Sequence, residues 1–162
     1  MMSHEPVLDA LRGSRLATEL SDDQMRVLAN SVAFRELRPG DVLVPEGASD
    51  NHLFVIVNGT LGVVKNAGKA DAVTLFSLTD GDFVGELGFI DGTRHYAALV
   101  ASAPTRLLGL EREKLEALLP THPEVVYRVM RAIIRTVHEI QRRISMQSTE
   151  LANYIYKQHG RY

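Results

Sequence analysis

The chain has 162 residues, of which 45% are hydrophobic, so it can bury one good core and a single domain is the natural expectation. Its formal net charge of −2 creates no strong field toward nucleic acid or a membrane, and the absence of cysteine excludes disulfide scaffolds, thiolate metal sites and cysteine nucleophiles. No secretory signal and no run of about 18 apolar residues is visible, so we expect a soluble, cytoplasmic protein.

The first elements are helical. Residues 5–20 predict a short helix that breaks near Gly13. Ser21-Asp22-Asp23-Gln24 then forms a capping box, because the Ser21 hydroxyl and the Gln24 side chain can each satisfy a free backbone amide. We therefore expect a second helix to begin at this point.

From residue 33 the apolar residues alternate, which is the period of half-buried strands. Glycines punctuate these runs at Gly40, Gly47, Gly59, Gly68 and Gly81. Short strands with regular turn signals predict a closed or sandwiched antiparallel sheet. Residues 62–70 resemble a P-loop only superficially, since the spacing is too long and no helix pattern follows, so they predict a hairpin turn.

The glycine-rich segment 81–98 carries the chemistry. Gly85 permits close approach of another molecule to the main chain, and a helical turn starting at Glu86 would offer free amides to an anion. Arg94 or His95 could complete a phosphate cradle, and Glu86 can accept hydrogen bonds from a sugar hydroxyl. Together these features predict a nucleotide site. The alternative is a plain loop joining two strands, with Glu86 on a solvated turn.

After two further strands, at 95–102 and 105–110, a short helix over 111–119 ends at Pro120. A long helix over 124–157 follows, and about 33 residues span roughly 50 Å, longer than a small barrel can cover. Its apolar residues recur at steps of four and three, at Val126, Met130, Ile133, Val137, Ile140 and Ile144, and the register continues through Gln147, Leu151 and Tyr154.

This heptad spacing predicts a parallel homodimer joined along the seam, with Gln147 as a polar layer that fixes the register. The alternative is one amphipathic helix lying on the barrel, toward which Val125, Val129 and Ile134 widen the apolar face. The length of the helix favours self-association through its distal half.

Several patterns argue against other functions. The histidines show no paired spacing on one element, as a metal-dependent jelly-roll enzyme would require, and no Ser-His-Asp or paired-carboxylate arrangement is present. We therefore expect no enzyme, no metal and no cofactor. Five arginines make the long helix basic, which is typical of a solvated face and only weakly indicates nucleic acid: Arg128, Arg131, Arg135, Arg142 and Arg143.

The run from Phe83 to Ala98 resembles the phosphate-binding cassette of cyclic-nucleotide-binding domains, which occur in bacterial catabolite activators and in protein kinase A regulatory subunits. Residues 38–47 and 53–59 resemble the first strands of that family, and the similarity covers about residues 16–145. The resemblance implies a mainly β fold with flanking helices, an eight-stranded antiparallel jelly-roll barrel. We expect N-terminal helices and barrel over 1–122, then a dimerisation helix and tail over 123–162.

The resemblance also implies the site. cAMP or cGMP would contact Phe83, Val84, Gly85, Glu86, Leu87, Arg94, His95, Ala97 and Ala98, with Glu86 on the ribose 2′-hydroxyl. The position of the family's phosphate-binding arginine, just before the Ala97-Ala98 pair, is occupied by His95, and Arg94 lies one residue earlier. We expect weak binding of the phosphate through Arg94. Where catabolite activators meet the base, this chain has Ile140-Gln141, which leaves base selectivity open.

The leading hypothesis is a stand-alone dimeric receptor that signals through its long helix to a separate protein, because no room remains for the helix-turn-helix of catabolite activators. No membrane or nucleic-acid partner is expected. One alternative is a degenerate copy that keeps the fold for dimerisation or partner docking without binding nucleotide. Another is a small jelly-roll metalloenzyme.

Overall fold

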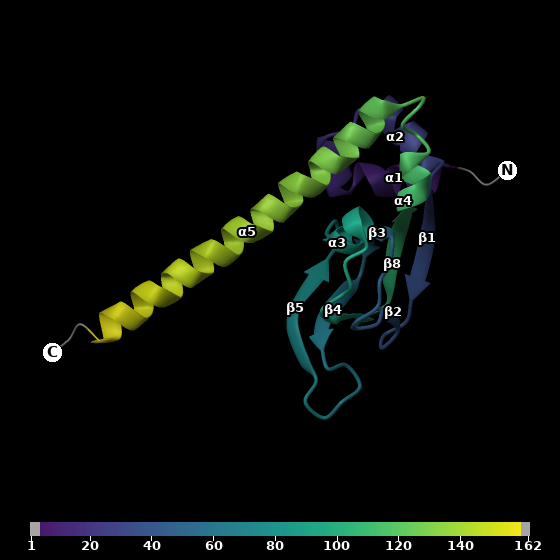
Figure 1. Cartoon of the computed structure of the whole chain (residues 1–162). Helices are drawn as coiled ribbons and strands as arrows, with labels where there is room; N and C mark the ends of the chain where they lie inside the picture. The colour runs from purple at the N-terminus through teal and green to yellow at the C-terminus, as the bar shows by residue number, and fades with distance from the viewer. Residues whose placement is uncertain (1–3, 160–162) are drawn as a thin grey trace.

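The computed structural model describes residues 4–159. The side chains that fall outside the description are those of Leu87, Ile140, Arg143, Ile144, Gln147, Ser148 and residues 156–159. Figure 1 shows a body of β-strands with short helices gathered at one end, from which the long helix α5 starts and runs out past the body.

The N-terminal helices follow the sequence signals. They are α1 (Glu5–Arg12), the 3₁₀ helix η1 (Arg15–Thr18) and α2 (Asp22–Ala29). The predicted break near Gly13 is confirmed. So is the capping box, in which the Ser21 amide donates to Gln24 Oε1 at 3.0 Å and the Gln24 amide donates to Ser21 Oγ at 3.2 Å.

Eight antiparallel strands form two four-stranded sheets. One sheet has the order β1 (Val32–Leu37), β8 (Thr105–Glu111), β3 (His52–Asn58) and β6 (Phe83–Val84). The other has the order β2 (Val42–Val44), β7 (Ala98–Ala101), β4 (Thr60–Lys65) and β5 (Val73–Thr79). The mainly β fold with flanking helices is confirmed. The eight strands lie in two sheets, as in the sandwiched form of the predicted antiparallel sheet. They do not form the predicted single barrel, because no ladder joins the two sheets in the part of the chain that is described.

Strand β3 serves two cores at once because successive side chains point to opposite faces of a sheet. Leu53 and Val55 pack into the core between the first sheet and the helices. Phe54 and Ile56 pack into the core shared by the two sheets. This double burial explains why the strand reads as an almost continuous apolar run rather than as a clean alternation.

The segment between β6 and β7 differs in part from the prediction. The predicted helical turn is present as α3 (Glu86–Asp91). Strand β7 begins at Ala98 rather than at residue 95, since the backbone of His95 is hydrogen-bonded to another loop. The His95 amide donates to the Ala48 carbonyl at 2.8 Å, and the Gly47 amide donates to the His95 carbonyl at 2.7 Å.

The C-terminal helices are α4 (Arg112–Glu116) and α5 (Pro123–His159). The first turns of α5 are buried in the helix-side core through Val125, Val129, Ala132 and Ile133. From residue 138 onward, every described side chain of α5 is exposed. None of the described helices is both long and apolar enough to cross a membrane.

This burial corrects the predicted seam. Ile133 is 0% exposed inside the core of its own chain, so it cannot face a partner helix. Val126, Met130 and Val137 are only half-buried and pack against the same core. The seam positions Ile140, Ile144 and Gln147 have side chains outside the described set, and Leu151 and Tyr154 are exposed.

Candidate ligand site

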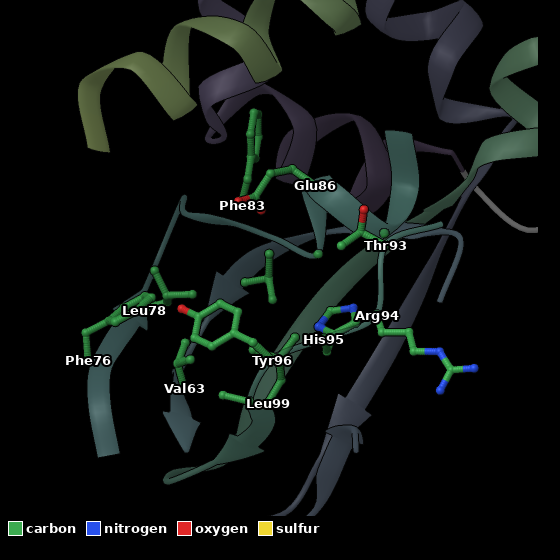
Figure 2. Close-up of a pocket in the computed structure, with 14 residues that line it drawn as sticks. Val63, Phe76, Leu78, Phe83, Glu86, Thr93, Arg94, His95, Tyr96 and Leu99 are labelled. Atoms are coloured by element: carbon green, nitrogen blue, oxygen red, sulfur yellow. The ribbon is translucent and has the colours of Figure 1, made fainter. Parts of the chain in front are cut away.

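A cavity of about 260 Å³ lies between the glycine-rich segment and the second sheet (Figure 2). Seven of the nine residues predicted for the site line it: Phe83, Val84, Gly85, Glu86, Arg94, His95 and Ala97. Ala98 is not part of the lining, and the side chain of Leu87 lies outside the described set. The predicted segment therefore folds around one hollow, and Ala98 is the member with a described side chain that does not line it.

Close packing against the start of β3 explains two of the glycines. Gly85 has φ +83°, in the left-handed region, and a Cβ there would lie 2.9 Å from the His52 carbonyl oxygen. A Cβ on Gly88 would lie 2.5 Å from the Asp50 carbonyl oxygen. Only glycine lets α3 sit this close to the strand, and that approach sets the position of the helix over the cavity.

Glu86 supplies an uncommitted carboxylate to the cavity. It is the first residue of α3, lies half-buried in the lining, and makes no hydrogen bond or ion pair with the residues that the structure describes. A carboxylate in this state can accept hydrogen bonds from a ligand's hydroxyl groups without first giving up a protein partner.

His95 supplies a ring nitrogen that has no hydrogen-bond partner among the described residues. Its Nε2 is buried and unpaired, and a Cβ on Gly88 would lie 3.3 Å from that atom. A buried polar atom left unpaired costs about 1–3 kcal/mol, so a ligand atom that bonded to this nitrogen would relieve the cost. The backbone bonds of His95 to the loop at Gly47 and Ala48 hold the residue in place.

Arg94 behaves differently from its neighbour. It contributes to the lining, but its guanidinium points away from the other lining side chains in Figure 2. The residue is exposed and forms no ion pair with the described part of the chain. The structure thus holds His95 against the cavity and directs the Arg94 guanidinium outward, while binding of a phosphate through Arg94 stays a prediction.

An apolar wall, not predicted from the sequence, faces these residues. Its large members are Val63, Phe76, Leu78, Tyr96 and Leu99. Phe76 is 47% exposed and Tyr96 is 57% exposed, an unusual state for two aromatic rings that line the same hollow. In Figure 2 the Tyr96 ring lies among these side chains, with its hydroxyl on the side of Leu78.

The wall could have been found only by pairing the strands. Val63 lies directly opposite Phe76 in the ladder between β4 and β5, and Leu78 is two residues further along β5 on the same face. Alternation marks these residues as one face of a hairpin, but nothing in the local sequence says that the glycine-rich segment covers it.

A lysine fixes the end of the segment. Lys65 Nζ donates to the Tyr96 carbonyl at 2.8 Å and forms an ion pair with Glu46. The hydrogen bond from Lys65 lowers the pKa of the Glu46 carboxyl, and a bond from the Asn66 amide at 3.2 Å acts in the same direction. Tyr96 is therefore tied to the β4–β5 hairpin through its backbone.

Comparison with known proteins bears on this geometry. Residues 34–122, more than half of the chain, match the cyclic nucleotide-binding domain family. The chain belongs to this family. Two solved structures extend the match to the three-dimensional fold. A cyclic nucleotide-binding domain from Methylobacillus flagellatus KT is 25% identical, with a TM-score of 0.74 over 86% of this chain and 79% of that one.

The second structure is the N-terminal domain of a transcriptional regulator from Streptomyces coelicolor A3(2). It is 26% identical, with a TM-score of 0.69 over 83% of this chain and 94% of that one. Among curated proteins, the cAMP-dependent protein kinase regulatory subunit of Blastocladiella emersonii is 25% identical over 122 residues, which are 75% of this chain and 30% of that protein. The chain spans less than a third of the first curated relatives it matches.

One residue of the segment departs from the pattern that the sequence resemblance predicts. A histidine with a buried, unpaired nitrogen occupies the position where the resemblance predicts an arginine. No group of three or more metal-ligating side chains is found among the described residues.

Proposed function

We propose that the cavity binds a cyclic nucleotide such as cAMP or cGMP, and that the domain acts as a receptor rather than as an enzyme. The observation that carries the proposal is the convergence, in the lining of one hollow, of the uncommitted Glu86 carboxylate and the His95 side chain. Membership of the family supplies the class of ligand.

Each part of such a ligand has a matching surface. The cyclic phosphate is assigned to the first amides of α3 and to His95, and the ribose 2′-hydroxyl to Glu86. The base is assigned to the apolar wall, where Phe76 and Tyr96 offer ring faces for stacking. Stacking of a base on an aromatic ring is worth about 1–3 kcal/mol.

The substitution of histidine for arginine makes the proposed affinity low. A hydrogen bond to a charged group contributes about 1.5–3 kcal/mol, and arginine offers a phosphate two parallel donors where histidine offers one. At about 1.4 kcal/mol for each factor of ten, the loss corresponds to roughly 10- to 150-fold in the dissociation constant.

The second candidate function is a degenerate module that docks or dimerises without nucleotide. It is favoured by the outward direction of the Arg94 guanidinium and by the Tyr96 ring, which takes up part of the same hollow. Under this reading the cassette is retained only because it completes the packing around α3.

The proposed output runs through α5. Arg15 of η1 connects the cassette to α5. Its Nη2 lies 3.5 Å from Asp82, just before the cassette, and its Nη1 lies 2.5 Å from Glu139 of α5. A ligand that shifts the cassette would shift Asp82 and so bias the position of α5, provided that it prefers one of the two arrangements. A homodimer through the distal half of α5, or a separate protein, would read the change.

Isothermal titration calorimetry of the full chain with cAMP and with cGMP tests the proposal. We expect saturable binding by one or both, and a loss of at least about tenfold in affinity for Glu86→Gln if the carboxylate holds the ribose. Glu36→Gln, at an exposed carboxylate on β1, is the matched control. No binding of either nucleotide at millimolar concentration would reject the receptor and leave the degenerate module.

A further inference from the structure

A row of cationic side chains runs along one face of α5. Its members are Arg128, Arg131, Arg135, His138 and Arg142, at steps of three, four, three and four residues. Such steps keep residues on one side of an α-helix, and the row covers about 21 Å of its length. We call these five residues the basic row. Arg131, Arg135, His138 and Arg142 are exposed, and Arg128 is half-buried.

Few carboxylates of the described structure offset this charge. Glu19 alone meets the first three arginines, with Oε2 at 3.7 Å from Arg128 and 3.0 Å from Arg131, and Oε1 at 3.1 Å from Arg135. Glu139 stands beside the row but is paired with Arg15. His138 and Arg142 form no ion pair with described residues. The proximal half of α5 thus carries several donors in excess of its acceptors.

An exposed apolar edge borders the basic row. Tyr127 is 58% exposed and Ile134 is 64% exposed, and they lie one heptad apart on the same side of α5. Met130 and Val137, half-buried against the core, continue the edge toward the body. The helix itself is held rigidly, since its opposite side is buried through Val125 and Val129. The result is a fixed surface with an apolar edge and a cationic row side by side.

We infer that this surface docks an acidic amphipathic helix of a partner protein. Helices that bind a surface of this kind use apolar anchors at helical spacing, and Ile134 and Tyr127 provide such contacts. Carboxylates on the adjacent face of the partner helix would meet the guanidinium forks of Arg131, Arg135 and Arg142. The row lies on the side of α5 opposite the predicted seam, so dimerisation through the distal half would leave it accessible.

Charge and composition favour a protein segment over other polyanions. The chain has a net charge of −2 and a pI near 6.3, so it lacks the overall positive field that attracts nucleic acid or an anionic membrane. Ile134, an exposed aliphatic side chain of this surface, suits a leucine of a partner helix. The inference is independent of the proposed nucleotide, because none of these residues lines the cavity.

The test uses the full chain and a labelled synthetic helical peptide of about three heptads, with glutamates at the spacing of the basic row beside a row of leucines. Fluorescence anisotropy measures its binding. Ile134→Asp and the pair His138→Glu with Arg142→Glu are each expected to weaken binding at least about tenfold. All three positions are exposed, so the variants should unfold at the wild-type temperature. Arg38→Glu, an exposed charge reversal between β1 and β2, is the control and should change affinity less than about twofold.

Further measurements distinguish an acidic helix from DNA, a membrane or a second copy of the chain as the ligand of this surface. A peptide with lysine in place of glutamate should not bind, and neither duplex DNA nor phosphatidylserine vesicles should compete with the acidic peptide. Absence of saturable binding, equal loss of affinity in Arg38→Glu, or binding of DNA or vesicles instead of the peptide would overturn the inference. A change in the mass of the free chain on Ile134→Asp would assign the surface to a second copy and also overturn it. Nucleotide affinity, measured on the same variants, should be unaffected.

Discussion

His95 is the residue that the proposal places against the phosphate. A ring N–H of histidine can donate a hydrogen bond to a phosphate oxygen. If His95 meets the phosphate, His95→Ala should weaken the binding of cAMP by about 1.5–3 kcal/mol, because a hydrogen bond to a charged group is lost. The measurement is calorimetry with the wild type, His95→Ala and Arg94→Ala.

The two variants distinguish the contacts. His95→Ala should lower the affinity for cAMP, whereas Arg94→Ala should leave it nearly unchanged, since its guanidinium points out of the cavity. Unchanged affinity in His95→Ala, together with a loss of about 1.5–3 kcal/mol in Arg94→Ala, would return the phosphate to Arg94.

Adding one methyl group at Gly88 is predicted to destabilise the fold. A Cβ there would come within 2.5 Å of the Asp50 carbonyl, so α3 would have to move away from β3. Gly88→Ala should lower the free energy of unfolding by about 1–3 kcal/mol. Gly62→Ala is the control, since its Cβ would meet its nearest atoms at 3.4 Å or more. Chemical denaturation compares the two, and equal stability would show that α3 is not tightly held.

Glu46 gives the β4–β5 hairpin a dependence on acid. Its pKa is lowered in the folded chain, first by the hydrogen bond from Lys65, so its ionised form stabilises the fold above its ordinary pKa. That contribution is lost as the pH falls through the folded value. The difference in melting temperature between wild type and Glu46→Gln should be present at about pH 6 and should shrink as the pH falls through the lowered pKa of Glu46 in the folded chain. A difference that persists unchanged in acid would mean that the carboxylate charge plays no part.

At the scale of elements, one carboxylate holds η1 against the long helix. The Glu19 side chain is 3% exposed and bonds to three arginines of α5. Glu19→Gln keeps the shape but removes the charge, and should cost about 1.5–3 kcal/mol of unfolding free energy. Glu36→Gln, whose carboxylate is 77% exposed and pairs with Arg106 at 3.6 Å, should cost less than about 1 kcal/mol. Similar losses for both would show that burial of Glu19 contributes little.

Elements governed by local signals were predictable from the sequence. The break at Gly13, the capping box at Ser21 and the start of α5 at Pro123 each depend on residues within one helical turn. The start of β7 was not predictable, because His95 is bound to the loop at Gly47 and Ala48, far away in sequence. The apolar wall was not predictable for the same reason, because it depends on contacts between residues far apart in sequence. Val63 and Phe76 lie beside the cassette only in the folded sheet.

The seam shows a different limit. Residues at steps of three and four form one face of a helix whether that face meets its own core or a second copy. Ile133 belongs to the series by spacing and yet lies in its own core. The periodicity identified the apolar face of α5. Only the fold shows that the body of the chain covers this face as far as Val137.

At the scale of the whole molecule, α5 divides into two parts with different environments. Up to Val137 one side of the helix is buried or half-buried, and beyond it every described side chain is exposed. Figure 1 shows this end of α5 running out past the body of the chain. The distal end of α5, from residue 138 to residue 159, carries exposed apolar residues such as Leu151. Such a segment favours association with a second helix. The distal part is therefore where α5 of a second copy would pair, whereas the proximal part is fixed to the body of its own chain by the core and by Glu19.

Dimerisation through the distal half is the last prediction. Leu151, 61% exposed, lies in the predicted seam, whereas Met146, 60% exposed, lies outside the series of three- and four-residue steps. If two α5 helices pair along the seam, the wild type should sediment as a dimer at about ten micromolar and above, and Leu151→Glu should sediment as a monomer, because a carboxylate in an apolar seam is left unpaired. Met146→Glu adds the same charge at equal exposure on another face and should remain dimeric. A monomeric wild type at that concentration would exclude the seam, and dissociation by Met146→Glu instead of Leu151→Glu would place the contact on a different face of α5.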